Sequence, residues 1–92
     1  MNVLNDNKKF YIKENDKILA YISYEIENNV INILSTFVDE SLRGKGIAKI
    51  LMQKVIELTQ KNNYKIIPTC SYAKKYLLNE NLNDLIYYEQ SI

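Results

Sequence analysis

Polar and apolar residues alternate along three runs in the first 38 positions, and this period is typical of half-buried β-strands. The runs cover residues 8–13, 18–26 and 30–38. Asn-Asp-Lys at 15–17 and Glu-Asn-Asn at 27–29 separate the runs, and both sequences favour tight turns. The pattern therefore predicts an antiparallel meander of three strands.

The second half of the chain has a different period. Apolar residues at 47–58 follow helical spacing, while lysines, glutamines and a glutamate occupy the opposite face. A fourth strand is expected at 64–69, and a short second helix at 71–80 with Ser71 as its N-cap. Pro68 lacks an N–H, so the far end of the fourth strand should have a free edge.

These elements predict the α+β fold class, with a mostly antiparallel sheet, one central helix and one short helix. A length of 92 residues suits a single domain, so we expect residues 1–92 to form one unit. The predicted core elements lie within residues 8–79. The asparagine-rich tail at 80–92 contains an apolar stretch and is assigned to no element.

Composition excludes several classes of function. The net charge is +1 and lysines are interspersed with carboxylates, so no basic patch predicts nucleic-acid binding. One cysteine excludes an intramolecular disulfide framework, and the chain has no histidine, the commonest metal ligand. No apolar run approaches the roughly 20 residues of a membrane span, and the N-terminus does not resemble a signal peptide. We therefore expect a cytoplasmic protein without metal, nucleic-acid or membrane partners.

Both glycines of the chain and its one arginine lie within the sequence Arg43-Gly44-Lys45-Gly46. Glycines between a strand and a helix let the backbone approach a ligand closely and leave the first helical N–H groups accessible. Those groups, together with the positive end of the helix dipole, favour a phosphate. The segment is therefore interpreted as a phosphate-binding loop. The alternative is that the glycines only form a sharp turn.

Two common phosphate loops do not match this segment. A Walker A loop requires G-x-x-x-x-G-K-[ST], which the chain lacks, and a dinucleotide fingerprint requires a glycine where Lys49 stands. The pattern R-x-x-G-x-A, formed by Arg43, Gly46 and Ala48, resembles the acetyl-CoA pyrophosphate loop of the GCN5-related N-acetyltransferase (GNAT) superfamily. The likeness spans about residues 8–79. With the later sequence Pro-Thr-Cys-Ser-Tyr, the chain resembles a branch of small single domains of about 100 residues, with a cysteine after the fourth strand.

The resemblance implies how acetyl-CoA would be bound. Backbone N–H groups of the glycine loop would hold the pyrophosphate, and the end of the third strand would offer main-chain hydrogen bonds to the pantetheine arm. The fourth strand would splay away from the third to admit that arm. The residues implied to bind acetyl-CoA are Val38, Arg43, Gly44, Lys45, Gly46, Ile47 and Ala48.

Three residues are candidates for chemistry. Cys70 follows the fourth strand at a helix N-terminus, which favours the reactive thiolate, and the resemblance places it near the thioester, where a transient acetyl-cysteine is conceivable. The alternative is that Cys70 is a small buried residue. Tyr72 and Tyr76 share a helix face, and the resemblance implies that one of them protonates the departing CoA thiolate. Since the chain has eight tyrosines, packing in the core is the alternative for both.

No general base is evident in the sequence. Small relatives often carry a histidine in the strand before the loop, and Ser35 stands at that position here. Glu25, Asp39 and Glu40 are the nearby carboxylates, of which Asp39 and Glu40 are expected to flank the loop or cap a helix. The chain also has no room for the N-terminal helices that build part of the acceptor site in typical members. We therefore expect an acceptor side that is open or that a partner completes.

Three functions remain open. The first is transfer of an acetyl group from acetyl-CoA to an amine, with protein amines among the candidate acceptors. The second is an acyl-CoA-binding sensor or interaction module that keeps the loop without the chemistry. The third is a structural or partner-binding domain, in which the glycines only form a turn.

Overall fold

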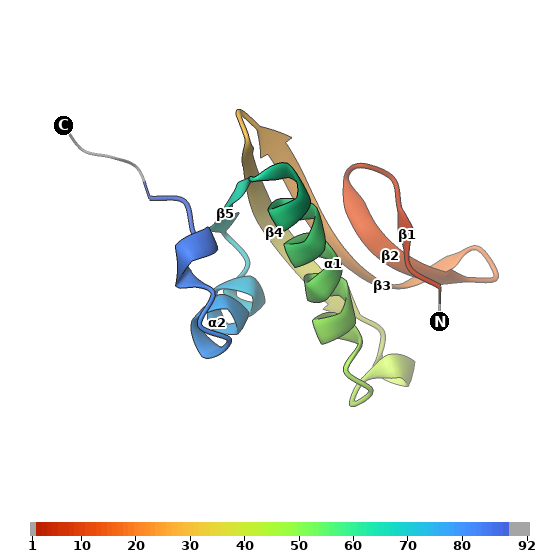
Figure 1. The fold of residues 1–92 in the computed structure, drawn as a ribbon. Coiled ribbons are helices and arrows are strands. Elements are labelled where there is room, and N and C mark those ends of the chain that lie inside the picture. Colours follow the sequence, from red (N-terminus) through yellow and green to blue (C-terminus); the bar gives the residue numbers. More distant parts are fainter. Residues whose placement is uncertain (1, 89–92) are drawn as a thin grey trace.

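The computed structural model describes residues 2–88, which form one sheet flanked by helices (Figure 1). Helix α1 (Ile47–Asn62) crosses one face of the sheet, and α2 (Ser71–Asn79) lies beside the last strand. The short 3-10 helix η1 (Glu40–Leu42) precedes α1, and η2 (Asn83–Leu85) follows α2. The predicted α+β class is confirmed by this arrangement.

Five strands follow each other in the sheet in chain order. Strands β2 (Lys9–Glu14), β3 (Lys17–Glu27) and β4 (Val30–Val38) form the predicted antiparallel meander. A two-residue strand β1 (Leu4–Asn5), which the sequence pattern did not predict, pairs with β2. Strand β5 (Lys65–Pro68) pairs with the edge of β4 that faces away from β3. The two strands run parallel, because helix α1 connects them as a crossover.

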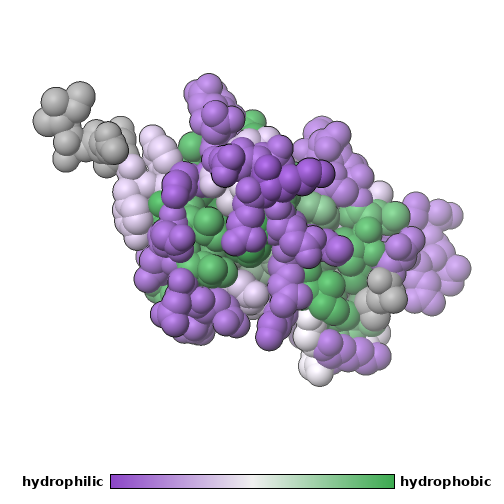
Figure 2. Space-filling model, viewed as in Figure 1, coloured by the Kyte–Doolittle hydropathy of each residue, from purple (hydrophilic) through white to green (hydrophobic). Residues whose placement is uncertain are grey.

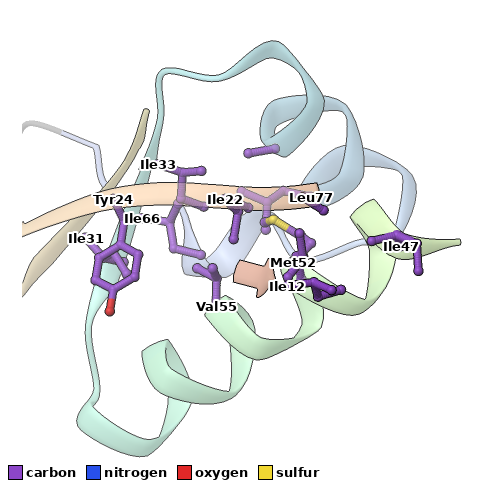
Figure 3. Close-up of a cluster of buried hydrophobic side chains, with 13 residues drawn as sticks. Ile12, Ile22, Tyr24, Ile31, Ile33, Ile47, Met52, Val55, Ile66 and Leu77 are labelled. Atoms are coloured by element: carbon purple, nitrogen blue, oxygen red, sulfur yellow. The ribbon is translucent and has the colours of Figure 1, made fainter. Parts of the chain in front are cut away.

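The main hydrophobic core lies between the sheet and the helices (Figure 3). The sheet contributes residues that alternate along its strands, and the helices contribute residues at helical spacing, so both predicted periods are observed. Full burial of a valine, leucine, isoleucine or methionine side chain contributes about 1.5–3 kcal/mol to folding, and burial of an alanine methyl group contributes less. The outward face of α1 is hydrophilic (Figure 2). The buried apolar residues are Ile12, Ala20, Ile22, Tyr24, Ile31, Ile33, Ile47, Leu51, Met52, Val55, Ile66, Ala73 and Leu77.

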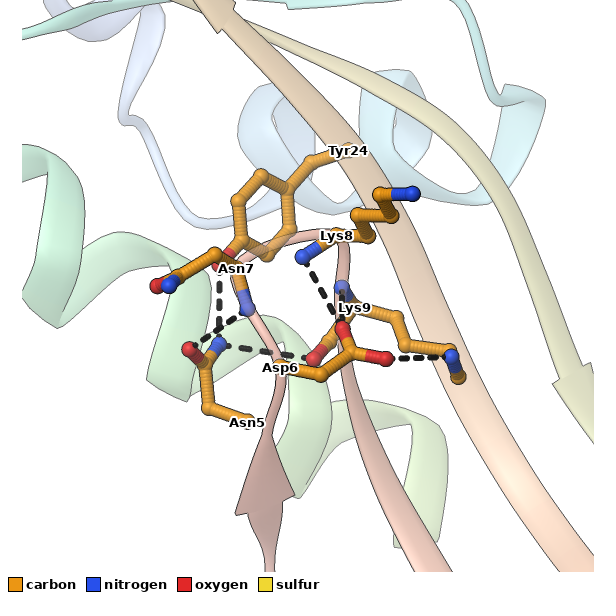
Figure 4. A network of polar contacts seen from close by, with 6 residues as sticks. All are labelled: Asn5, Asp6, Asn7, Lys8, Lys9 and Tyr24. Carbon is orange, nitrogen blue, oxygen red and sulfur yellow. Dashed lines mark hydrogen bonds and ion pairs between the residues drawn. The ribbon is translucent and has the colours of Figure 1, made fainter.

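The N-terminal segment is tied to the core through Tyr24, whose side chain is 3 % exposed. Asn5 Nδ2 donates a 2.8 Å hydrogen bond to the Tyr24 hydroxyl (Figure 4). Next to it, Asp6 accepts hydrogen bonds from the backbone N–H groups of Lys8 and Lys9 and from the Lys9 ammonium. These bonds, above all the one from the ammonium, lower the pKa of Asp6. The short strand β1 therefore satisfies a buried hydroxyl as well as extending the sheet.

A β-bulge in β4 determines where the sheet opens. Ile33 and Ser35 pair with consecutive residues of β3, so Leu34 between them has no partner there. The parallel ladder between β4 and β5 ends at the pair Ile33–Pro68, directly before the bulge. Because a bulge bends its strand and increases the local twist, it accounts for the end of the ladder. Within the described chain, residues 35–38 have no strand partner on the β5 side.

The structure changes two details of the predicted second half. Cys70, not Ser71, occupies the N-cap position of α2, and its side chain makes no capping hydrogen bond. The observed N-cap therefore lies one residue before Ser71, the cap that the preference of serine for this position suggested. In addition, the tail returns to the core: Leu82, Leu85 and Ile86 pack against it, so the core extends beyond residue 79. The last four residues of the tail lie outside the described residues.

Candidate functional site

The loop between β4 and α1 places both glycines in the left-handed backbone region. Gly44 has φ 80° and Gly46 has φ 72°, and Gly46 is the N-cap of α1. A Cβ added at either glycine would have no atom within 4 Å, so backbone conformation, not crowding, explains the preference for glycine. No side chain caps the first N–H groups of α1. Those groups are therefore available to a ligand.

Asp39 fixes the start of the loop. Its carboxylate accepts hydrogen bonds from the Ser41 backbone N–H at 3.0 Å and from the Ser41 hydroxyl at 2.6 Å. These two bonds lower the pKa of Asp39, and the positive charges of Lys17 and Arg43 add to the effect. Asp39 is thus the N-cap of η1, as the sequence suggested for one of the loop carboxylates.

A pocket of about 350 Å³ lies at the start of α1, between the loop and the beginning of α2. It brings together six of the seven residues expected to bind acetyl-CoA, all except Lys45, and one of the three candidates for chemistry, Tyr72. Leu42 and Lys49 also line it and were not among the predicted site residues. The full lining is Val38, Leu42, Arg43, Gly44, Gly46, Ile47, Ala48, Lys49 and Tyr72.

Val38 presents its main chain to the unpaired edge of β4. The next residue, Asp39, donates its N–H to the carbonyl of Leu19 at 2.7 Å, and therefore faces β3. Since successive residues of a strand face opposite neighbours, the N–H and C=O of Val38 point to the edge that β5 leaves open. The Val38 carbonyl accepts a 3.2 Å hydrogen bond from Arg43 Nε.

Cys70 lies where β5 passes into α2, and it does not line the pocket. Its backbone N–H donates to the Ile33 carbonyl at 2.9 Å, a backbone hydrogen bond directly after the β4–β5 ladder ends. Its Sγ atom is 3.5 Å from Thr36 Oγ1, across the gap beyond the bulge. The half-buried thiol packs against the core at this junction, and it also borders the gap. Thr36 carried no signal in the sequence that could have identified it.

The two tyrosines of α2 occupy different positions. Their ring centres are 6.1 Å apart, but only Tyr72 lines the pocket. Burial raises the pKa of the Tyr72 hydroxyl, and Tyr76, Cys70 and Glu80 add to the shift. The hydroxyl therefore stays protonated at neutral pH, which is the state that a proton donor requires.

No carboxylate lines this pocket in the described part of the chain. Ser35, at the position where a base was considered, lies 2.8 Å from Ser23, hydroxyl to hydroxyl. Ser23 alternates with the buried Ile22, so this pair lies on the sheet face opposite α1. Glu25 lines a separate pocket on that face.

Among residues 2–88, no cluster of Cys, Asp and Glu side chains has a metal-site arrangement, and no helix has the length and apolarity needed to span a bilayer.

Comparisons with known proteins agree with this architecture. A family model described as GCN5-related N-acetyl-transferase matches residues 9–85. The solution structure of a GCN5-like protein from Staphylococcus aureus has a TM-score of 0.76 and 37% identity, covering 98% of this chain and 90% of that one. An aminoglycoside N-acetyltransferase in complex with CoA has a TM-score of 0.55 and 15% identity, covering 96% of this chain and 72% of that one, and shows the fold alone.

The curated relatives are much longer than this chain. Human N-acetylaspartate synthetase is 40% identical over 58 residues, which are 63% of this chain and 19% of the relative. The chain spans about a fifth of the length of the curated relatives that it matches. The likeness therefore covers one portion of those proteins.

Proposed function

Because the chain belongs to the GCN5-related N-acetyltransferase family, we propose that it binds acetyl-CoA at the start of α1 and transfers the acetyl group to an amine. One observation carries the proposal: a single pocket unites the loop glycines, the open edge at Val38 and the hydroxyl-bearing Tyr72. Phosphate contacts, an arm-binding edge and a proton donor are three of the parts that acetyl transfer from CoA would use.

The proposed binding mode follows from the groups that line the pocket. The uncapped N–H groups at the start of α1 and the helix dipole would hold the pyrophosphate, and Arg43 and Lys45 would add positive charge. The pantetheine arm would lie along the unpaired edge of β4 and hydrogen-bond to the main chain of Val38. The bulge at Leu34 supports this placement, because the β4–β5 ladder ends just before it.

In direct transfer, the amine nitrogen attacks the thioester carbonyl carbon, a C–N bond forms and the C–S bond breaks. The departing CoA thiolate takes a proton from the Tyr72 hydroxyl, and the amine releases a proton to water. The tyrosinate then regains a proton from solvent. The place of Tyr72 in the pocket lining supports this role. Burial raises the pKa of its hydroxyl, which leaves the group protonated at neutral pH and makes it a weaker acid than an exposed tyrosine.

A covalent route through Cys70 is the second mechanism. The thiolate of Cys70 would attack the thioester carbonyl carbon, forming one C–S bond while the C–S bond to CoA breaks and CoA leaves as a thiolate. The amine would then attack the acetyl-cysteine, forming the C–N bond, breaking the C–S bond to Cys70 and restoring its thiolate. The amine proton passes to solvent, from which the CoA thiolate is protonated. The position of the thiol beside the gap between β4 and β5, 3.5 Å from Thr36 Oγ1, supports this route. Its place outside the pocket lining favours direct transfer.

A second function has its own supporting observation. The pocket has no carboxylate in its lining, and Ser35 pairs with Ser23 instead of providing a base. Such a site suits an acyl-CoA-binding module that senses the ligand without acetyl transfer.

Acceptor-dependent release of CoA tests the proposed function. Acetyl-CoA is incubated with the protein and a panel of amines and peptides, free thiol is measured, and intact mass spectrometry follows the protein. Catalysis predicts release above the buffer rate with at least one acceptor. An acetyl adduct that is absent in Cys70→Ala would support the covalent route. Acetyl-CoA binding without release would favour the binding module, and absence of binding would refute both functions.

A further inference from the structure

A second pocket, of about 410 Å³, lies on the sheet face opposite α1. Glu25 and Glu27 contribute to it, and they alternate along β3 with the buried Tyr24, so they face away from α1. Asn32 pairs with Glu25 on one side and with Ile67 on the other. Three neighbouring strands therefore form the floor. The complete lining is Glu25, Glu27, Asn28, Val30, Asn32, Ile67 and Tyr87.

The wall of this pocket comes from the tail that follows η2. Ile86 forms a parallel bridge with Ile66, and the Tyr87 N–H donates a 2.8 Å hydrogen bond to the Ile66 carbonyl. These contacts hold the tail along β5. The Tyr87 side chain, 42 % exposed, consequently borders the hollow beside the two glutamates.

The negative charge of this pocket is not neutralised within the described chain. Glu25 and Glu27 are exposed and, like Glu14, Glu40, Glu80 and Asp84, have no lysine or arginine nitrogen within 4.0 Å among residues 2–88. Lys65 pairs in the sheet with the pocket residue Val30. Its ammonium nevertheless donates to the Asp84 carbonyl at 2.6 Å, and so is held outside the pocket.

The pocket adjoins the place where β4 and β5 part. The Thr69 hydroxyl donates a 2.6 Å hydrogen bond to Asn32 Oδ1, and Thr69 directly precedes Cys70. The hydroxyl pair of Ser23 and Ser35 lies two residues along β3 from Glu25, about 7 Å away. This pocket lies beside the paired Val30–Asn32 end of β4, and the loop pocket lies at the Val38 end on the opposite face, so the point where β4 and β5 part is between them along the strand.

We propose that the second pocket binds a cationic group, either an ammonium or a guanidinium. The two carboxylates supply electrostatic attraction, and the Tyr87 ring adds a cation–π surface. For a peptide ligand, the Asn32 amide N–H groups would donate to a carbonyl of the peptide. Resting on the proposed acetyl transfer, we further assign to it the recognition of a positive charge that the acceptor carries beside its reacting amine. Polyamines and lysine-rich peptides share this chemistry. Acceptors with neutral or acidic surroundings lack it.

The test uses spermidine and a blocked peptide with two lysines as separate probes, titrated into the protein without acetyl-CoA and followed by backbone amide NMR. At least one probe is expected to give saturable shifts at residues 25–32, 66–67 and 87. The double variant Glu25→Gln, Glu27→Gln should bind at least about five-fold more weakly, and added salt should weaken binding. Glu57→Gln, on the outer face of α1, is the matched control and should bind as the wild type does.

Tyr87→Leu provides an independent variant, since it removes the aromatic ring while retaining an apolar wall, and it should also weaken binding. Binding of spermidine alone would identify a polyamine site, and binding of the peptide alone a basic-peptide site. Equal affinity for wild type and the double variant, or no saturable shift with either probe, would overturn the proposal. Acetyl-CoA binding is measured on the same samples and should be unchanged in the double variant. Its absence in the wild type would refute the proposed function while leaving the cation site standing.

Discussion

Arg43 Nε donates a 3.2 Å hydrogen bond to the main-chain oxygen of Val38. The bond joins the glycine loop to the end of β4, and both residues line the loop pocket. The carbonyl of Val38 lies at the edge of the strand that has no partner from β5. A ligand that hydrogen-bonds to this carbonyl must therefore share it with the guanidinium or displace the guanidinium.

Two substitutions of Arg43 test the contributions of its charge and of its hydrogen-bonding geometry separately. Arg43→Lys keeps the charge but loses the planar donor group, whereas Arg43→Ala loses both. We expect acetyl-CoA affinity, measured by calorimetry, to fall about ten-fold in Arg43→Ala and by less in Arg43→Lys. Only the alanine variant should also show a reduced dependence of affinity on salt. Identical affinities for both variants and the wild type would show that the side chain has no part in binding.

Gly46 should tolerate asparagine better than alanine. Its φ of 72° is costly for alanine by about 1–2 kcal/mol, whereas asparagine enters the left-handed region more readily. Urea unfolding should therefore give a lower free energy of unfolding for Gly46→Ala, with Gly46→Asn between it and the wild type. Since an added Cβ meets no atom within 4 Å, equal stability of the alanine variant and the wild type would contradict the backbone explanation.

Tyr72 and Tyr76 form a matched pair for testing proton donation. Tyr72→Phe should lower kcat about 100-fold with little change in KM, because the hydroxyl acts on the departing thiolate. Tyr76→Phe removes the same group from the neighbouring ring outside the pocket and should leave kcat unchanged. If both variants retain wild-type kcat for CoA release, the donor is not a tyrosine of α2.

The free energy of unfolding should fall in acid, partly because Asp39 becomes protonated. Its folded pKa lies below the ordinary aspartate value of about 4, so the charged form stabilises the fold above that value. The contribution is lost as the pH falls through the lowered pKa. Chemical unfolding of wild type and Asp39→Asn should show a difference that is constant between pH 6 and 8 and shrinks below about pH 4. A difference that persists unchanged to the most acidic pH would exclude this linkage.

Local patterns were sufficient to predict the meander, the central helix and the glycine loop. Alternation depends on neighbouring residues of one strand, and the positive φ angles of Gly44 and Gly46 are the kind of backbone conformation for which glycine is the usual residue. The two-residue strand β1 was missed because it is too short to show a period. Its contact with Tyr24 depends on tertiary packing.

The bulge at Leu34 changes which side chains of β4 face α1, and periodicity alone does not reveal it. Unbroken alternation would place Ser35 and Phe37 on the face of the buried Ile33. Instead, Thr36 and Val38 pair with the buried Ile22 and Ala20 and share their face. Ser35 consequently lies on the other face of the sheet.

The second pocket also lay beyond sequence reasoning. Glu25, Asn32 and Ile67 meet only through the pairing of three strands. Tyr87 joins them because the tail returns along β5, and the tail sequence has no regular period that would predict this return. Prediction of such a site requires the tertiary arrangement.

The central claim, that the loop pocket binds acetyl-CoA, is tested most directly by an NMR titration of the protein with acetyl-CoA. The account predicts saturable amide shifts at residues 36–38 and 43–49, together with loss of binding in Gly46→Val, whose folding is checked by the same spectrum. Absence of saturable shifts at millimolar acetyl-CoA, or shifts confined to residues outside this pocket, would contradict the claim.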